Sequence, residues 1–283
     1  MINGIMTSCY AWVSSIVGSR EKASSTGSPL PATPHVALPL TLVKKRLVII
    51  GDIHGCLDEL KRLLEKVKFE PSTTTVISVG DTIVKGPDSV GVVRYIRSLP
   101  AGSFFVVRGN HEDNALLARL KLNPKYSEGP GFQFVNEFSD NEIEWLKQLP
   151  VSISVPELGL LVVHAGLDPA KIGQPVNKHE FSDLIRIRCV DTDGKTSNKK
   201  PEQGKRRLWA TMYQGPPLVV FGHDAKQKLQ IHPWARGLDT GCVYGGALTA
   251  LVIEDTRDTK GWMEKAEIVS VHAARVYCQK DEE

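Results

Sequence analysis

The sequence predicts an α/β fold, and two observations support this prediction. Short apolar runs of strand length alternate with segments whose apolar residues recur at helical spacing, which is typical of βαβ units and a largely parallel sheet. Further apolar runs dominate the second half of the chain, and we expect them to form a second sheet. With 283 residues, 41% of them hydrophobic and 24% charged, the chain is long enough for one large α/β domain or two small ones.

The strand–helix unit occurs three times in succession. Strands are expected over residues 46–50, 74–80 and 103–109, because each is an apolar run of strand length. Each run precedes an expected helix, over residues 56–69, 88–99 and 111–122. The first of these helices places five apolar residues at helical spacing: Leu57, Leu60, Leu63, Leu64 and Val67.

The chain after residue 122 follows a different pattern. Residues 123–134 are expected to form a loop, and residues 139–150 a short helix capped by Ser139 and ended by Pro150. The strands assigned to the second sheet cover residues 151–155, 159–166, 217–223 and 247–253. Residues 191–207 are polar and basic, and a mobile loop is expected there.

The sequence does not predict the N-terminal region to be part of the folded domain. Residues 24–39 are rich in serine and proline without periodicity, as in a linker or tail. We therefore expect a disordered tail over residues 1–43 and a folded domain over residues 44–283. The first residues lack the basic leader and long apolar run of a secretory signal. Acidic residues are nearly absent before position 40, so a weak organelle-targeting role stays open beside a plain tail.

Net charge, apolar runs and cysteine spacing bear on the class of protein. A net charge of +3 is too small to argue by itself for binding to nucleic acid or to a membrane surface. No stretch reaches the roughly 18 apolar residues that a membrane span requires. Five widely spread cysteines without a CxxC pair favour free thiols in a reducing compartment. We expect a cytoplasmic monomer without a membrane span.

Polar side chains gather where the expected strands end. The first strand is followed by Asp52 and His54, the second by Asp81, and the third by Asn110 and His111. Two later strands end in His164 and His223. Because strands of an α/β sheet align their carboxyl ends at one edge, we expect these side chains to converge.

Taken singly, each of these residues has an ordinary explanation. A histidine beside glycine is more often part of a turn than a ligand, and an aspartate after a strand is usually a helix cap. Together they predict a metal centre, because two carboxylates, three imidazoles and an amide occupy equivalent positions. Such a set suits two divalent cations bridged by one aspartate and by water. Nitrogen and oxygen donors without thiolate fit Mn, Fe, Zn or Co better than Ca.

The blocks GD-x-H-G, GD-x(4)-G, GNH-E/D, HAG and GH occur in this order from about Arg46 to Ile253. They resemble those of the calcineurin-like metallophosphoesterases of the phosphoprotein phosphatase superfamily. The resemblance implies a catalytic domain built on a β-sandwich of two mixed sheets flanked by helices. It also implies one metal held by Asp52, His54 and Asp81, and His111 as the general acid. The second metal would be held by a set that includes the bridging aspartate: Asp81, Asn110, His164 and His223.

One departure from the family pattern bears on the substrate. The Ser/Thr protein phosphatases have an aspartate, which orients the catalytic histidine, and an arginine where this chain has Val84 and Lys85. An orienting carboxylate would have to come from elsewhere, and Asp113 and Asp239 are the candidates. The block "GDTIVKGPDS" and the segment "LDTGCVYGGALTALV" resemble instead the symmetrical diadenosine tetraphosphatases, the ApaH-like phosphatases and some fungal polyphosphatases.

The resemblance implies hydrolysis of phosphoanhydride bonds, in polyphosphate, dinucleoside polyphosphates or a nucleotide cap. Nucleic acid would then be a partner only as a capped or nucleotide substrate. The main alternative is a Ser/Thr phosphoprotein phosphatase, which Val84 disfavours. A catalytically inactive phosphate-binding scaffold would require a missing ligand, and all six are present.

Candidate substrate-binding residues are basic. Lys85 would place a point charge on the phosphate chain, or else be a surface lysine at a turn. Arg186 and Arg188 alternate as in a strand and could reach a phosphate, although surface pairing is an equal alternative. Residues 195–207 could attract polyanions or simply be solvated. Tyr244 could stack on a base or make a plain apolar contact, and Glu112 would support the ligands or begin a helix.

Overall fold

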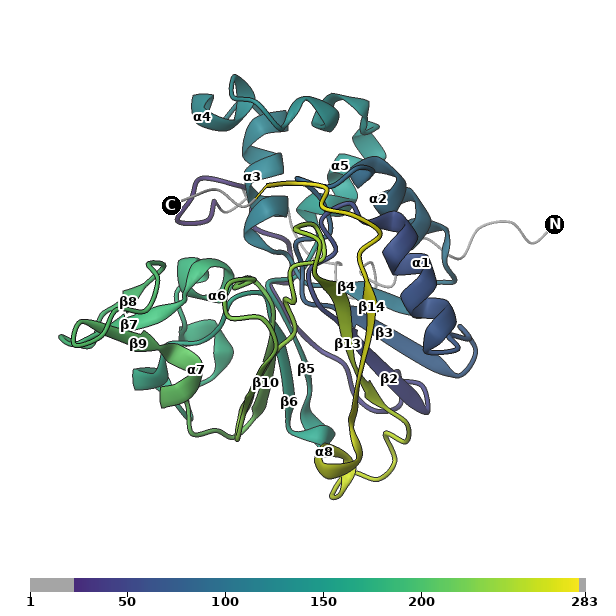
Figure 1. The fold of residues 1–283 in the computed structure, drawn as a ribbon, viewed down its shortest axis with the longest axis vertical. Helices are drawn as coiled ribbons and strands as arrows, with labels where there is room; N and C mark the ends of the chain where they lie inside the picture. Colours follow the sequence, from purple (N-terminus) through teal and green to yellow (C-terminus); the bar gives the residue numbers. More distant parts are fainter. Residues whose placement is uncertain (1–22, 280–283) are drawn as a thin grey trace.

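The computed structural model describes residues 23–279, which form two mixed β-sheets packed face to face and flanked by helices (Figure 1). This arrangement confirms the predicted fold class. The first sheet has five strands in the order β14-β13-β2-β3-β4, and β2, β3 and β4 run parallel. Their bounds are β2 Arg46–Ile50, β3 Thr74–Ser78, β4 Phe104–Val106, β13 Ala247–Ile253 and β14 Glu267–His272.

The second sheet has six strands in the order β1-β5-β6-β10-β12-β11, and β6 and β10 at its centre run parallel. Their bounds are β1 His35–Ala37, β5 Ser152–Val155, β6 Leu160–Val163, β10 Leu218–Phe221, β11 Gln230–His232 and β12 Ala235–Gly237. A third, three-stranded sheet stands beside it, formed by β7 Cys189–Asp191, β8 Thr196–Ser197 and β9 Arg206–Leu208.

Alternation along β2 explains how one strand serves two cores. Leu47 and Ile49 point between the two sheets, where they join residues of the second sheet such as Val162. Val48 and Ile50 point to the opposite face, toward the helices. A strand that is buried on both faces reads as a continuous apolar run, which is why no alternation shows in the sequence.

Helices cover the outer faces of both sheets. The first sheet is covered by helices whose apolar faces share one core with Val48 and Ile50: α1 Leu57–Lys66, α2 Ser89–Ser98, α3 Asn110–Arg119 and α5 Asp140–Lys147 (Figure 1). The second sheet is covered by α6 Phe181–Arg186 and α7 Trp209–Met212, around the buried ring of Trp209. Short helical turns complete the set: α4 Pro124–Ser127, η2 Gln133–Glu137, η3 Pro156–Leu158, η4 Pro169–Lys171, η5 Val176–Lys178 and α8 Trp262–Lys265.

Three expectations about individual segments were wrong. Residues 247–253 belong to the first sheet, as β13, because this strand pairs antiparallel with β2. Residues 123–134, expected as a loop, contain α4, whose first turn begins at Pro124 and is capped by Asn123. Residues 191–207, expected as a mobile loop, contain β8 and most of β9, which pair with β7.

The boundary predicted at residue 44 lies too late in the chain. β1 pairs in parallel with β5, and the Ser28 hydroxyl donates a hydrogen bond to the buried carboxylate of Asp113. The buried guanidinium of Arg108 donates to the carbonyl oxygen of Pro29 at 2.7 Å. Residues 23–43 are therefore packed on the domain, although their sequence offers little apolar pattern. Residues 1–22 of the predicted tail, with the targeting role considered for them, lie outside the described residues.

A comparison of two truncated chains tests this boundary. Removal of residues 1–43 is expected to lower the free energy of unfolding by about 3 kcal/mol relative to removal of residues 1–22. The longer deletion takes hydrogen-bond partners from two buried charged groups, Asp113 and Arg108, at a cost of roughly 1–3 kcal/mol each. Urea denaturation measures the difference. Equal stabilities of the two truncated chains would show that residues 23–43 contribute nothing to the fold.

The remaining general expectations concern cysteines and membrane spans. The four cysteines within residues 23–279 are free, as predicted, and Cys9 lies outside the described residues. Within the same part of the chain, no helix combines the length and apolarity needed to cross a bilayer.

Candidate metal centre

The predicted ligands lie at the carboxyl ends of parallel strands. Those that follow β2, β3 and β4 come from the first sheet, and those that follow β6 and β10 come from the second. Two glycines allow the loops to approach one another closely. A Cβ at Gly109 would collide with the carboxylate of Asp81, and one at Gly222 would collide with that of Asp52. The site is therefore a junction of five loops at one edge of the sandwich.

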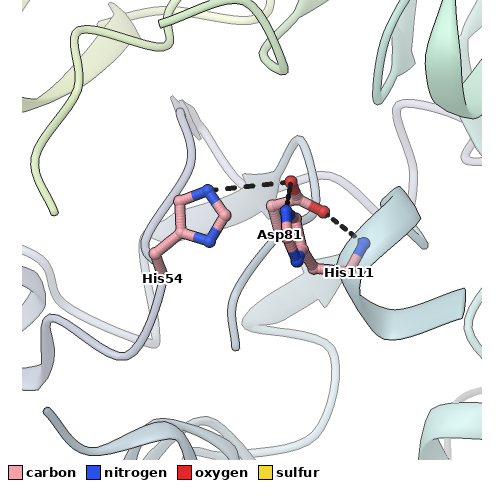
Figure 2. Close-up of side chains that lie close together, drawn as sticks. All are labelled: His54, Asp81 and His111. Atoms are coloured by element: carbon pink, nitrogen blue, oxygen red, sulfur yellow. Dashed lines mark hydrogen bonds and ion pairs between the residues drawn. The ribbon is translucent and has the colours of Figure 1, made fainter. Parts of the chain in front are cut away.

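The first cluster contains His54, Asp81 and His111 (Figure 2). The Nε2 atoms of His54 and His111 lie 3.7 Å and 3.8 Å from Oδ2 of Asp81. The other carboxylate oxygen of Asp81 accepts a hydrogen bond from the backbone N–H of His111 at 2.9 Å. This bond fixes the carboxylate against the first turn of α3.

The second cluster contains Asp81, His164 and His223, whose nearest donor atoms all lie within 4.8 Å of one another. Nε2 of His164 lies 3.3 Å from Oδ2 of Asp81 and 3.0 Å from Oδ1 of Asn110. Asp81 thus belongs to both clusters. Paired His/Asp clusters that share one aspartate suggest a two-metal site.

Asp52 completes the set of six predicted ligands. Its Oδ2 atom lies 3.9 Å from Nε2 of His54, and both of its oxygens accept from the backbone N–H of His223 at 3.1 Å. The structure therefore brings all six predicted side chains together. It places His111 beside them, within the first cluster.

The hydrogen bonds of the imidazoles show whether these residues fit a metal. Nδ1 of His54 faces the carbonyl oxygen of Ile83 at 3.2 Å, and Nδ1 of His164 faces that of Val79 at 3.1 Å. A carbonyl oxygen can only accept a hydrogen bond, so Nδ1 of each ring carries a hydrogen and donates it, which leaves Nε2 as the ring atom that faces Asp81. Nε2 of His223 is buried without any hydrogen-bond partner among the described residues. Lone pairs of nitrogen and oxygen thus converge, which favours a shared cation.

Burial and neighbouring charges set the protonation states. Burial, together with the ammonium of Lys85, holds the pKa of His54 well below its usual range. Burial and the guanidinium of Arg188 do the same to His223. These rings are neutral at pH 7, which is the form that binds metals. Burial would raise the pKa of Asp81, but the imidazoles of His164 and His111 outweigh it and hold this pKa well below its usual range.

Glu112 is the support of the shared aspartate. This fully buried carboxylate accepts hydrogen bonds from the backbone N–H groups of Gly109, Asp81 and Thr82, at 2.8, 2.9 and 2.6 Å. It also accepts from the Thr82 hydroxyl at 2.8 Å. Both predicted roles are therefore present, since Glu112 closes the first turn of α3 and holds the loop that carries Asp81.

The loop after β3 has an uncommon backbone. Asp81, Val84 and Lys85 have φ angles of 48°, 76° and 69°, in the left-handed region that non-glycine residues rarely adopt. For the β-branched Val84 this conformation is strained, at a cost of roughly 1–3 kcal/mol. Packing of Val84 into the core beneath α2 and a hydrogen bond from its N–H to the Ser89 hydroxyl at 2.9 Å hold it there. The turn aims Lys85 at the site.

A pocket of about 640 Å³ opens over the clusters. Lys85 lines it, with Nζ 3.5 Å from Nε2 of His54 and 5.3 Å from the ring centre of Tyr244. Tyr244 thus contacts the lysine, and no base-stacking role is needed to explain its position. Five further basic residues share the lining, and of these the sequence analysis named only Arg188 individually: Arg188, Lys199, Lys200, Arg206 and Lys226.

Arg186 is placed differently from the expectation. It is the last residue of α6 rather than part of a strand, and it does not line the pocket. Its guanidinium lies 3.4 Å from a carboxylate oxygen of Asp113 and donates to Oδ1 of Asn114 at 2.9 Å. Arg188 also lies outside any strand, between α6 and β7. The apparent alternation of the two arginines arises at a helix end.

Neither candidate for orienting His111 contacts it by a hydrogen bond. The carboxylate of Asp113 accepts from Thr26 and Ser28, and Oδ1 of Asp239 accepts from the backbone N–H of Gly241. Nδ1 of His111 is buried and has no hydrogen-bond partner in the described part of the chain. Burial lowers the pKa of His111 to about 3. The ring is therefore neutral, and no described carboxylate accepts a hydrogen bond from its Nδ1.

Comparison with known proteins agrees with this geometry. Residues 45–246 match the family model of the calcineurin-like phosphoesterases. The chain is 33% identical to the asymmetrical bis(5'-nucleosyl)-tetraphosphatase PrpE of Halalkalibacterium halodurans, over 72% of this chain and 88% of the relative. It is 32% identical to the symmetrical bis(5'-nucleosyl)-tetraphosphatase of Yersinia enterocolitica, over 74% of this chain and 88% of the relative.

Solved structures show the same similarity. A crystal structure assigned provisionally as a diadenosine tetraphosphatase is 35% identical, with a TM-score of 0.70, over 85% of this chain and 98% of that one. A serine/threonine phosphatase from Saccharomyces cerevisiae is 16% identical, with a TM-score of 0.56, over 87% of this chain and 85% of that one, and shares the fold.

The sandwich and the paired clusters at its edge define a class of enzyme, the metal-dependent phosphoesterases. Within that class, the chain belongs to the calcineurin-like phosphoesterase family and is related to the bis(5'-nucleosyl)-tetraphosphatases. The predicted resemblance is thereby confirmed.

Proposed function

We propose that the protein is a two-metal hydrolase of phosphoanhydride bonds, with dinucleoside polyphosphates or related phosphate chains as substrates. The observation that carries this proposal is a pair of His/Asp clusters sharing Asp81 beneath a pocket lined by basic side chains. The names of the related tetraphosphatases support the same substrate class. Symmetrical and asymmetrical enzymes match almost equally well, so the position of the cut is left to experiment.

The six ligands divide between two ions in this proposal. Asp52, His54 and Asp81 would hold one ion, and Asp81, Asn110, His164 and His223 would hold the other. Imidazole and oxygen donors fit Mn, Fe, Zn or Co. When bound, such a pair supplies Lewis acidity toward a phosphoryl oxygen and lowers the pKa of a shared water.

The protein's own groups bind and orient the phosphate chain. The ammonium of Lys85 lies beside His54 at the floor of the pocket, where it can contact a phosphoryl oxygen as a point charge. Arg188 lines the same pocket and adds a second cation. Arg186 reaches the substrate only if it leaves Asp113 and Asn114, so we assign it the support of α3.

The environment of His111 favours anhydrides over phosphate esters. A neutral imidazole whose Nδ1 has no hydrogen-bond partner is a poor general acid, and general-acid help is typically worth 10²–10⁴-fold. A phosphate leaving group needs little protonation, because it is far less basic than the alkoxide that leaves from phosphoserine. Val84 lies in an apolar core and cannot supply the missing carboxylate. These features argue against the alternative, a Ser/Thr phosphoprotein phosphatase.

A substrate panel tests the proposal. The purified protein, supplied in turn with Mn, Co, Zn and Mg, is assayed on diadenosine tetraphosphate, tripolyphosphate, capped RNA and a phosphoserine peptide. We expect kcat/KM for one of the anhydrides to exceed that for the peptide by at least about 10²-fold, the lower bound of the missing general-acid help. Nucleotide products distinguish symmetrical from asymmetrical cleavage, and Asn110→Ala is the inactive control. Faster hydrolysis of the phosphopeptide would refute the proposal.

A further inference from the structure

The pocket extends well beyond the two metal clusters, toward the small β7–β9 sheet. Five basic residues line this outer part, and we call them the distal cationic cluster: Arg188, Lys199, Lys200, Arg206 and Lys226. They come from three separate segments, since Arg188 precedes β7, Lys199 to Arg206 follow β8, and Lys226 follows β10. Among the residues that the structure describes, three acidic ones share the lining of the whole pocket: Asp81, Asp224 and Asp239.

Hydrogen bonds fix the loop that carries the two lysines. The guanidinium of Arg188 donates to the carbonyl oxygen of Asn198 at 2.9 Å, and that of Arg206 donates to the carbonyl oxygen of Lys200 at 3.3 Å. These two carbonyls flank Lys199, whose own N–H donates to the hydroxyl of Ser197 at 3.2 Å. Arg188 and Arg206 are therefore positioning residues as well as cations, and they hold Lys199 and Lys200 at the wall of the pocket.

The acids of the outer part leave the cluster positive. Asp224 lies 3.8 Å from Nε of Arg188 and offsets one charge. Asp239 is buried, and its Oδ1 accepts from the backbone N–H of Gly241 rather than pairing with a residue of the cluster. A pocket of about 640 Å³ is also far larger than one phosphate requires, and it lies within the range of cofactor-sized sites. A concave wall of one sign concentrates ligands of the opposite sign.

We propose that the distal cationic cluster is a binding subsite for the phosphates of the substrate that extend beyond the bond being cleaved. The inference rests on the proposed function and deepens it: the enzyme selects long anionic phosphate chains over pyrophosphate. The subsite recognises the chain itself, so inorganic tetraphosphate and dinucleoside tetraphosphates share it. Lys85 serves the reacting phosphoryl group, and Lys199 and Lys200 serve the distal ones.

The test compares two double variants on the same small sheet. Lys199→Ala/Lys200→Ala removes two charges from the pocket wall. Lys195→Ala/Lys205→Ala removes two charges from the same sheet outside the pocket, where the side chains are 81% and 68% exposed and pair with Asp193 and Glu202. Both variants change the net charge equally, so a general effect of charge appears in both.

We expect the pocket variant to raise KM for diadenosine tetraphosphate and for inorganic tetraphosphate by about tenfold, as for two exposed ion contacts. KM for pyrophosphate and kcat for all three substrates should stay within about twofold of wild type on the same reasoning, because pyrophosphate does not reach the cluster. The control variant should match wild type. The KM difference should shrink as salt is raised from 0.05 to 0.5 M, since exposed charges are screened.

Three results would overturn the inference. Equal changes in KM in the pocket and control variants would mean that the net charge of the protein alone affects binding. An equal rise in KM for pyrophosphate in the pocket variant would place the two lysines at the reacting phosphate. A change in KM for diadenosine tetraphosphate but not for inorganic tetraphosphate would mean that the cluster contacts the nucleoside. If the metal-loaded protein hydrolyses none of these compounds, the proposed function fails, and calorimetric binding of inorganic tetraphosphate to both variants still decides the subsite.

Discussion

Replacement of Asp81 by asparagine is expected to lower kcat/KM by on the order of 10³-fold or more. Oδ2 of Asp81 lies 3.3 to 3.8 Å from the Nε2 atoms of three imidazoles, and among residues 23–279 no other side chain belongs to both clusters. An amide in its place removes the negative charge that a bridging position between two cations requires. Oδ1 of the asparagine can still accept the N–H of residue 111, so the fold should survive. Steady-state kinetics and bound metal per chain are the measurements.

Asp183→Asn is the matched control for this variant. Asp183 is also a buried aspartate, in α6, but it does not line the pocket. We expect the control to keep its metal and to stay within about twofold of wild-type activity, as a change away from the reacting groups should. An Asp81→Asn protein that retains both metals and full activity would contradict the proposed bridge.

Replacement of Glu112 by alanine should reduce stability and activity together. The change leaves three buried backbone N–H groups and the Thr82 hydroxyl without their acceptor. We expect the free energy of unfolding to fall by about 4 kcal/mol, since each buried donor left unpaired costs roughly 1–3 kcal/mol. Loss of a group that supports a metal ligand typically costs 10–100-fold in activity or metal affinity. Urea denaturation and kcat/KM measure the two effects.

The variant Glu142→Ala separates a loss of stability from a loss of activity. Glu142 occupies the same position in the first turn of α5 as Glu112 does in α3, and it accepts from the backbone N–H of Ser139 at 2.7 Å. This variant should lose stability while its kcat/KM stays at the wild-type value, because α5 carries no residue of the pocket. If Glu112→Ala keeps wild-type kcat/KM under conditions where it is folded, the assignment of Glu112 as the support of Asp81 is wrong.

The sequence predicted that six donor side chains converge, because chemistry and topology coincide at the ends of these strands. Asp52, Asp81 and Asn110 follow three parallel strands, and parallel strands end at one edge whatever their order in the sheet. His164 and His223 follow two parallel strands of the other sheet, at the same edge of the sandwich. The local pattern was therefore sufficient to predict that these side chains lie close together.

Pairing partners could not be read from the same patterns. Residues 247–253 form an apolar run that would suit either sheet, and only its antiparallel pairing with β2 places it in the first. Residues 35–37 are too short and too close to prolines to suggest a strand, yet pairing with β5 makes them one. Pairing energy comes from the neighbouring strand, which a local window does not contain.

The sequence by itself determined the class of fold, the six convergent donors and the absence of an orienting carboxylate at position 84. Tertiary structure decided which basic side chains face the pocket: it brought Lys199 and Lys200 to the wall and turned Arg186 toward Asp113. The reason is physical. A strand fixes the direction of the residue at its end, whereas the position of a charge on a hairpin depends on the strand pairs and hydrogen bonds that carry it.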